Sequence, residues 1–122
     1  MKVMLLANEA PEDFALRDDK EKFDAYMGEW YAFGRALRDA DAMGESAPLE
    51  APSTATVISV RDGVRKVEDG PYPDTKEQLG GFCIIDVADM DRAVEWAAKC
   101  PAAQNGYVDA RPVPILEEGD AS

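Results

Sequence analysis

Hydrophobic positions along the chain recur at two spacings, one typical of helices and one of strands. Spacings of three and four residues predict a long helix from Lys20 to Met43, with Gly44 as its C-terminal cap. Its apolar stripe consists of Phe23, Tyr26, Met27, Trp30, Phe33 and Leu37. A shorter helix begins after Asp89, which has the position of an N-cap, and ends before Pro101. Stripes of large apolar residues are more often core than cofactor sites, so both helices should pack on a sheet.

Short apolar or alternating runs predict the strands of that sheet. They are Val3 to Ala7, Thr54 to Arg61, Val64 to Glu68, Phe82 to Val87 and Tyr107 to Val113. Asp62-Gly63 is a strong signal for a tight hairpin turn, and Pro112 places the last strand at an edge. Residues 8–19 are read as a loop with one helical turn at most, and residues 45–52 as a loop or irregular edge strand.

The order of these elements predicts an α+β fold of the ferredoxin-like sandwich type, of the dimeric α/β barrel kind. Two β-α-β units, with a hairpin between them, form a mainly antiparallel sheet with two helices on one face. Ile58, Ile84 and Val87 cannot all point at those helices, so the other face needs a cover. A second copy of the sheet is the simplest cover, which predicts a homodimer. We expect a single domain over residues 1–116 and a mobile acidic tail over residues 117–122.

Composition narrows the possible partners. The 122 residues include 25 acidic and 13 basic ones, for a net charge of -12. This balance argues against direct contact with nucleic acid or with anionic membranes, because both need clustered Lys and Arg. The apolar start of the chain, Met1 to Ala7, is too short for a signal peptide. No apolar run is long enough for a membrane span, so we expect a cytoplasmic protein.

Histidine is absent from the sequence, which excludes the commonest general base, histidine-paired nucleophiles and imidazole metal sites. The two cysteines, Cys83 and Cys100, are far apart and have no metal-binding spacing. We expect both to be buried, reduced and inert. The sequence therefore gives no reason to expect a metal or another cofactor.

Candidate chemistry concentrates in the stretch from Val67 to Val87, a polar turn between two apolar strands. Such turns often present function on a rigid scaffold. Asp69 and Glu77 are the candidate catalytic carboxylates, although a structural Asx turn before Gly70-Pro71 is the more common role for an aspartate placed like Asp69. Gly80 and Gly81 allow the backbone to approach a neighbour closely. The candidate ligand-binding residues, with the long helix supplying an aromatic wall, are Tyr26, Trp30, Tyr72, Thr75 and Lys76.

The segment from Val57 to Val113 resembles the DGPF branch of the YCII-related proteins. The motif appears here as Asp69-Gly70-Pro71-Tyr72, with Tyr in place of the family's Phe, followed by a matching run over residues 75–82 and by Glu95-Trp96-Ala97-Ala98. The resemblance extends more weakly through the first strand and the long helix. It implies a dimeric ferredoxin-like fold. Some YCII-related proteins have been suggested to be enzymes because a histidine on the long helix and an aspartate form a pair in a pocket. This chain has no histidine and cannot form that pair. Tyr26 stands roughly where the histidine would be.

Two functions from different classes stay open. One is a small-molecule-binding or regulatory module that uses a pocket beside the Asp-Gly-Pro-Tyr turn, as the association of some DGPF-type proteins with sigma-factor-like regulators suggests. The other is a small cofactor-independent enzyme of proton-transfer or lyase type, with a carboxylate base. The module is favoured because no catalytic constellation is complete in the sequence.

Overall fold

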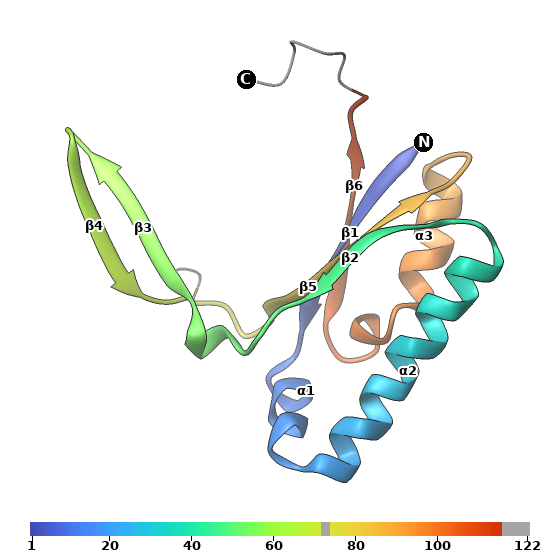
Figure 1. The fold of residues 1–122 in the computed structure, drawn as a ribbon, viewed down its shortest axis with the longest axis horizontal. Helices are drawn as coiled ribbons and strands as arrows, with labels where there is room; N and C mark the ends of the chain where they lie inside the picture. Colours follow the sequence, from blue (N-terminus) through green and yellow to red (C-terminus); the bar gives the residue numbers. More distant parts are fainter. Residues whose placement is uncertain (72–73, 116–122) are drawn as a thin grey trace.

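The computed structural model describes residues 1–71 and 74–115 of the chain (Figure 1). Its strands are β1 (Lys2–Glu9), β2 (Met43–Pro48), β3 (Thr56–Arg61), β4 (Val64–Asp69), β5 (Gln78–Asp86) and β6 (Tyr107–Val113). Its helices are α1 (Pro11–Ala15), α2 (Lys20–Asp39) and α3 (Met90–Lys99), with short 3₁₀ turns at Leu16–Asp18, Pro52–Thr54 and Pro101–Ala103. The acidic tail predicted at residues 117–122 lies outside the described residues.

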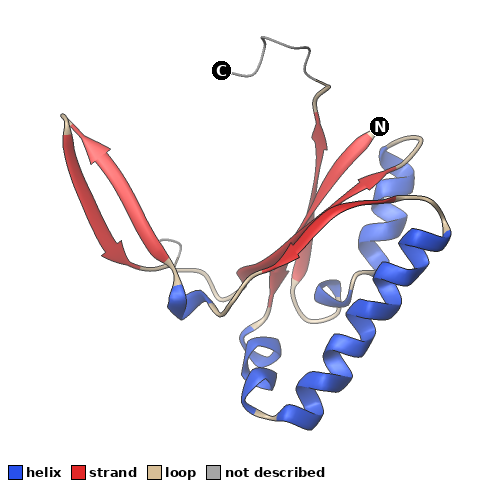
Figure 2. Ribbon diagram, in the orientation of Figure 1, coloured by secondary structure: helices blue, strands red, loops and turns tan. Residues whose placement is uncertain are grey.

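Four strands form one antiparallel sheet in the order β2-β5-β1-β6. Both long helices, α2 and α3, cover the same face of this sheet (Figure 2). This confirms the predicted α+β fold with an antiparallel sheet and two helices on one face. β2 and β6 are the edge strands, as the prolines near their ends favour.

The core lies between the helices and the sheet. Side chains alternate along β1, so Val3, Leu5 and Ala7 point at the helices and are almost fully buried. Leu37 of α2 and Ile85 of β5 complete this layer. Edge-to-face contacts join Tyr26, Trp30, Phe33 and Trp96 in a continuous aromatic row. The stripe predicted on the long helix is therefore largely core.

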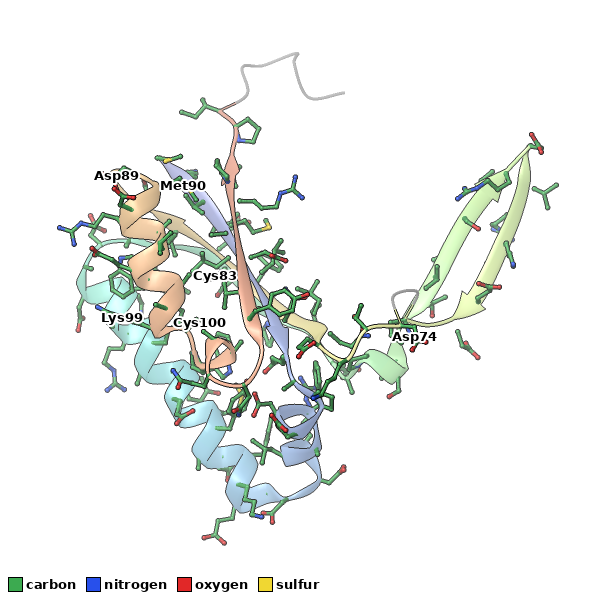
Figure 3. All side chains as sticks on the ribbon, turned by 180° about the vertical axis from the view of Figure 1, so that it is seen from behind. Asp74, Cys83, Asp89, Met90, Lys99 and Cys100 are labelled. Atoms are coloured by element: carbon green, nitrogen blue, oxygen red, sulfur yellow. The ribbon has the colours of Figure 1, made fainter. Side chains whose placement is uncertain are left out.

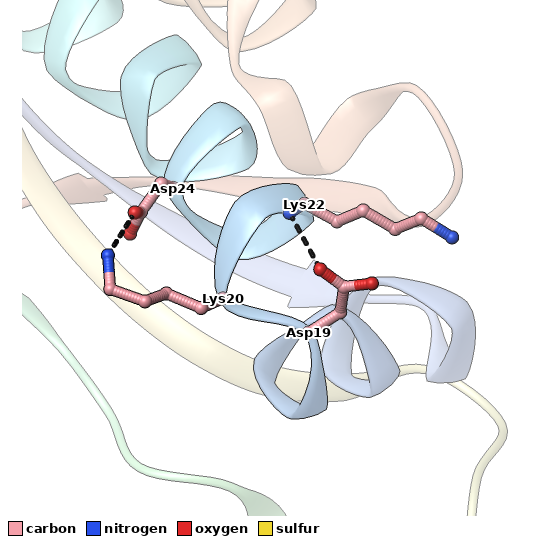
Figure 4. Close-up of polar contacts among 4 residues, drawn as sticks. All are labelled: Asp19, Lys20, Lys22 and Asp24. Atoms are coloured by element: carbon pink, nitrogen blue, oxygen red, sulfur yellow. Dashed lines mark hydrogen bonds and ion pairs between the residues drawn. The ribbon is translucent and has the colours of Figure 1, made fainter.

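α2 begins where the sequence predicts. The Asp19 carboxylate accepts a hydrogen bond of 3.1 Å from the backbone N–H of Lys22 and so caps the helix (Figure 4). Lys20 forms an exposed ion pair of 2.7 Å with Asp24 one turn later (Figure 4). Such an exposed pair contributes at most a few tenths of a kcal/mol, so the cap is the main local signal.

The prediction that α2 reaches Met43 and is capped by Gly44 is wrong. The helix ends at Asp39, and Asp41 adopts the left-handed conformation, with φ of 55°. The N–H of Ala42 bonds to the Leu37 carbonyl and that of Asp41 to the Arg38 carbonyl, which closes a Schellman motif. Asp is among the few residues that tolerate this position, so no glycine was required there.

Gly44 instead lies in β2, where its missing side chain serves packing. A Cβ at this residue would lie 2.6 Å from the carbonyl oxygen of Ile84. β2 can therefore approach β5 closely. The region read as a loop or irregular edge strand is an edge strand in its first half.

The second half of the chain agrees closely with the sequence. The Asp89 carboxylate accepts a 3.0 Å hydrogen bond from the N–H of Arg92 and caps α3, as predicted. Asp62 and Gly63 both have positive φ and turn β3 into β4, which confirms the hairpin. Within residues 1–71 and 74–115, however, this hairpin shares no ladder with the main sheet, and it stands apart from the body (Figure 1).

Ile58, Ile84 and Val87, which were predicted not to face the helices together, lie in three different places. Ile84 lies on the face of the sheet that the helices leave open, whereas Val87 packs against the core. Ile58 belongs to the separate hairpin.

Across the described ranges, no helix is both long and apolar enough to span a bilayer.

Candidate functional site

A cavity of about 320 Å³ lies between α2 and the sheet. Side chains of α2 form one wall, and β1, β2 and the first half of β5 form the other. Phe23, Met27, Trp30 and Phe33 make the helix wall mainly aromatic and apolar. A concave, mostly apolar space with few polar groups is the usual form of a small-molecule site.

Glu9 supplies the acidic group of this cavity. It is the last residue of β1 and continues the alternation of Val3, Leu5 and Ala7, so its side chain points at the helices. Only 5% of its surface is exposed. A carboxyl group so deeply placed is costly unless it is hydrogen-bonded or protonated.

Tyr26, two turns into α2, is the hydrogen-bonding partner of Glu9. Its hydroxyl donates to Oε1 of the Glu9 carboxylate, and both residues are buried. Burial raises the pKa of the Tyr26 phenol, and the hydrogen bond to Glu9 raises it further. Tyr26 therefore stays protonated and remains a donor across the physiological pH range.

The Glu9 carboxyl group itself has a raised pKa. Burial is the main cause of the increase above the ordinary pKa of 4.5, and the negative charge of Asp13 adds to it. The hydrogen bond from Tyr26 and the positive charge of Arg17 lower the pKa but do not cancel the effect of burial. A carboxyl with a raised pKa in a cavity is better suited to general acid–base chemistry than a solvated one.

A bulge in β5 makes room for this carboxyl group. Ala7 pairs with Gly81 and Asn8 pairs with Leu79, so Gly80 is the extra residue. A Cβ at Gly80 would lie 1.5 Å from Oε2 of Glu9, which shows how closely the carboxyl lies on the backbone. The close approach that the two glycines predict is present, and Glu9 uses it.

Arg17 also lines the cavity. Its guanidinium group donates a 2.9 Å hydrogen bond to the carbonyl of Leu49, just after β2. The same group lies 5.4 Å from the ring centroid of Phe14 and 5.9 Å from that of Phe23. These contacts hold a positive charge near Glu9 and link the α1 region to the edge of the sheet.

Asp13 of α1 is a second buried carboxylate near this site. It is 6% exposed, and its Oδ1 accepts a 3.1 Å hydrogen bond from the side-chain amide of Asn105. It lines a separate hollow beside Tyr26, between α2 and the turn that precedes β6. Its charge reaches both Glu9 and Tyr26, so the polar end of the cavity is acidic.

The structure brings two of the predicted site residues to the cavity, Tyr26 and Trp30. Asp69 does not line it: this residue ends β4, is exposed, and pairs with Thr56 in the hairpin. Glu77 is half-buried and also lies outside the cavity lining. The carboxylate that occupies the expected place opposite the long helix is Glu9.

Thr75 and Lys76, which follow the Asp-Gly-Pro-Tyr turn, do not reach the cavity. Thr75 is exposed and donates a 2.7 Å hydrogen bond from its hydroxyl to the carbonyl of Glu77. Lys76 is exposed. Figure 3 shows the nearby Asp74 at the base of the hairpin, away from Cys83 and Cys100. Tyr72 lies outside the described residues.

Sequence reasoning missed Glu9 and Arg17, and it predicted a close approach at Gly80 without identifying Glu9 as the group that uses it. In the structure every second residue from Val3 onward is buried, and Glu9 is the next in that series. Val3 to Ala7 is apolar at every position, so the sequence itself does not reveal this alternation. The signal for Arg17 was also weak, since its role depends on contacts with Leu49, Phe14 and Phe23.

Both cysteines are free and buried, and both border the cavity. Burial raises the pKa of Cys83 to about 11 and that of Cys100 to about 12. They are therefore thiols at neutral pH and poor nucleophiles. In the part of the chain that the structure describes, no group of three or more Cys, Asp or Glu residues is arranged to hold a metal.

Comparisons with known proteins agree with this fold. The solved structure of 5-chloro-2-hydroxyhydroquinone dehydrochlorinase (TftG) from Burkholderia phenoliruptrix AC1100, in complex with 2,5-dihydroxybenzoquinone, superposes with a TM-score of 0.50. The match covers 93% of this chain and 94% of that chain at 14% sequence identity. At this identity the likeness shows the fold alone.

Sequence comparison gives the family. An uncharacterised protein of Rhizobium meliloti (strain 1021) is 32% identical over 103 residues, which cover 83% of this chain and 83% of that protein. The profile of the YCII-related domain matches residues 1–116. The chain therefore belongs to the YCII-related family.

Proposed function

We propose that this protein binds a small, largely apolar molecule in the cavity beneath α2, with Glu9 and Tyr26 as the groups that meet its polar end. One observation carries the proposal: Glu9, a residue only 5% exposed, contributes a carboxyl group to an otherwise mainly apolar cavity wall. Burial of that group lowers stability unless it is compensated. A ligand that hydrogen bonds to Glu9 would supply compensation and specificity together.

The cavity limits the chemistry of the ligand. Its volume of about 320 Å³ lies at the lower end of the range for small-molecule sites, which suits one ring or two fused rings. Glu9 and Asp13 make the polar end acidic, and Arg17 already donates to Leu49. A neutral hydroxyl or an amine, which donates a hydrogen bond, therefore fits better than an anion.

Titration with 2-naphthol, a neutral two-ring phenol, tests this proposal. Quenching of tryptophan fluorescence should saturate at one molecule per chain, because Trp30 lines the cavity. The buried Ala7 lines the same space, and Ala7→Leu should weaken binding by filling it. The matched control is Ala32→Leu on the exposed side of α2.

Glu9→Gln adds a test that does not depend on filling the cavity. It removes the charged acceptor and should weaken 2-naphthol binding by roughly tenfold, the scale of one hydrogen bond to a charged group. 2,5-Dihydroxybenzoquinone, which the structural neighbour binds, is an anion at neutral pH and should therefore bind more weakly than 2-naphthol. Absence of saturable binding, or equal affinity in Ala7→Leu and Ala32→Leu, would overturn the proposed site.

A second candidate function is proton transfer with Glu9 as the general base. The raised pKa of the Glu9 carboxyl, within a cavity that accepts apolar molecules, favours it over Asp69 and Glu77. The probe is 2-tetralone, an apolar ketone with acidic C–H bonds beside the carbonyl. Enzyme in deuterated buffer should accelerate exchange at that carbon, and Glu9→Gln should abolish the acceleration while Glu77→Gln retains it.

We further propose that the protein is a homodimer packed through the open face of its sheet. Met4, Leu6, Phe82 and Ile84 lie on that face and are only half-buried in one chain. The family resemblance also implies a dimer. Leu6→Asp should give a monomer in sedimentation equilibrium at micromolar concentrations. The cytoplasmic location and the absence of direct nucleic-acid contact stay predictions from composition.

A further inference from the structure

The hairpin formed by β3 and β4 has no partner within its own chain. Among the described residues, neither strand pairs with the four-stranded sheet, and every residue of β4 is exposed. Figure 1 shows the hairpin separated from the body by the segments on either side of it. A single two-stranded hairpin is marginally stable in water, so its order needs another surface.

The two faces of the hairpin differ in character. Ile58 pairs with Val67, and Val60 lies two residues along on the same face. Ile58 is 59% exposed, and Val60 and Val67 are each 57% exposed. The opposite face carries Ser59, Arg61, Lys66 and Glu68, with Val57 and Val64 at its two ends, and Arg65 lies on the first face opposite Val60. The three adjacent aliphatic side chains therefore make the first face the better one for packing.

The hairpin also differs from the body in charge. Residues 56–69 hold three basic residues, Arg61, Arg65 and Lys66, and three acidic residues, Asp62, Glu68 and Asp69. They sum to zero, so the net charge of -12 lies entirely in the rest of the chain. The acidic body of a second copy would repel another acidic surface. It would not repel this neutral hairpin, whose arginines are exposed.

The position of the hairpin points to the same occupant. It rises on the side of the sheet away from α2 and α3, in both opposite views (Figures 1 and 3). That is the side on which Leu6 and Ile84 are left uncovered. A second chain packed on the open sheet face would enter the space between that face and the hairpin.

We propose that the hairpin is a clasp whose apolar face, formed by Ile58, Val60 and Val67, packs against a second copy of this chain. In a two-fold dimer each chain would both give and receive one clasp. This inference rests on the proposed homodimer but adds a separate surface to it. Clasp and sheet face can therefore be tested independently.

The main variant is the double change Ile58→Glu with Val67→Lys. The new side chains face each other across the strands as an opposite-charge pair, so the hairpin keeps a favourable cross-strand contact while its apolar face is lost. Val64→Lys is the matched control, because Val64 is 67% exposed on the other face. Dimer dissociation constants are measured by sedimentation equilibrium on the full chain.

The double variant should weaken the dimer by roughly tenfold or more, as loss of central interface residues does, while Val64→Lys stays near the parent value. Hydrogen exchange should show amides of residues 56–69 protected in the dimer and unprotected on dilution to monomer. Unchanged dimer affinity in the double variant, or fast exchange of these amides in the dimer, would overturn the clasp. If Leu6→Asp dissociates the dimer and the double variant does not, the sheet interface stands and the clasp fails.

Discussion

The carboxyl group of Glu9 occupies the space that a side chain at Gly80 would fill. A Cβ built on Gly80 would lie 1.5 Å from Oε2 and 2.6 Å from Cδ of Glu9. The last residue of β1 and the bulge of β5 are therefore one structural unit. The carboxyl reaches its buried place because the neighbouring strand has no side chain there.

Gly80→Ala should displace the Glu9 carboxyl from this place. We expect a loss of about 1–3 kcal/mol in the free energy of unfolding, the usual scale for overpacking. Binding of 2-naphthol should weaken in parallel. Urea denaturation and the fluorescence titration measure the two effects.

Gly28→Ala is the control for the change of residue type. No atom lies within 4 Å of a Cβ at Gly28, which is exposed on α2, so this variant should gain about 0.5–1 kcal/mol from helix propensity. Equal stability of Gly80→Ala and the parent protein would contradict the tight contact with Glu9.

The raised pKa of Glu9 predicts a specific pH dependence of stability. Between pH 4.5, the ordinary pKa, and its higher pKa in the folded protein, the native state binds more protons than the unfolded state. The contribution of Glu9 is therefore fully present below pH 4.5 and is lost as the pH rises through the folded pKa. Stability curves of the parent and Glu9→Gln, measured by urea denaturation, should diverge over this window in favour of Gln. Parallel curves would contradict the assignment.

Tyr26→Phe removes the hydrogen bond that lowers the Glu9 pKa, so that pKa should rise further. The buried carboxyl also loses its donor, and stability should fall by about 1–3 kcal/mol. Carbon-13 NMR of the carboxyl group follows the titration directly. Tyr31→Phe is the control, because Tyr31 is on the same helix and 65% exposed. A Glu9 pKa that stays the same or falls in Tyr26→Phe would rule out this coupling.

Much of the fold follows from local patterns in the sequence. The period of the α2 stripe, the Asp89 cap and the Asp62-Gly63 turn each determine their element through nearby residues. The end of α2 was mispredicted because Asp41 can adopt the left-handed conformation that usually marks glycine. Aspartate adopts the left-handed conformation much less often than glycine, so an aspartate in the sequence is weaker evidence for a helix end.

The site depended on longer-range information. The stretch around Asp69 to Glu77 contains many ionisable groups, but its position relative to the body is not encoded in its composition. The hairpin carries Asp69 away from the cavity, whereas strand alternation carries Glu9 into it. Tyr26 and Trp30 were predictable because a helical stripe fixes which side chains face the sheet. Alternation along β1 indicates which face of the strand Glu9 shares, but the sequence does not show that this face meets α2 at Tyr26.

The buried thiols give a last prediction. With pKa values of about 11 for Cys83 and about 12 for Cys100, only roughly a thousandth or less of either is thiolate at pH 8. Ellman's reagent should therefore modify neither cysteine in the folded protein at pH 8, and both after unfolding in guanidinium chloride. Val64→Cys, an exposed thiol on the hairpin, is the positive control and should react at once in the folded state. Because both native cysteines border the cavity, saturating 2-naphthol should slow any residual reaction at Cys83 and Cys100 but not at residue 64. Rapid modification of either native thiol in the folded chain would contradict the burial that raises their pKa values.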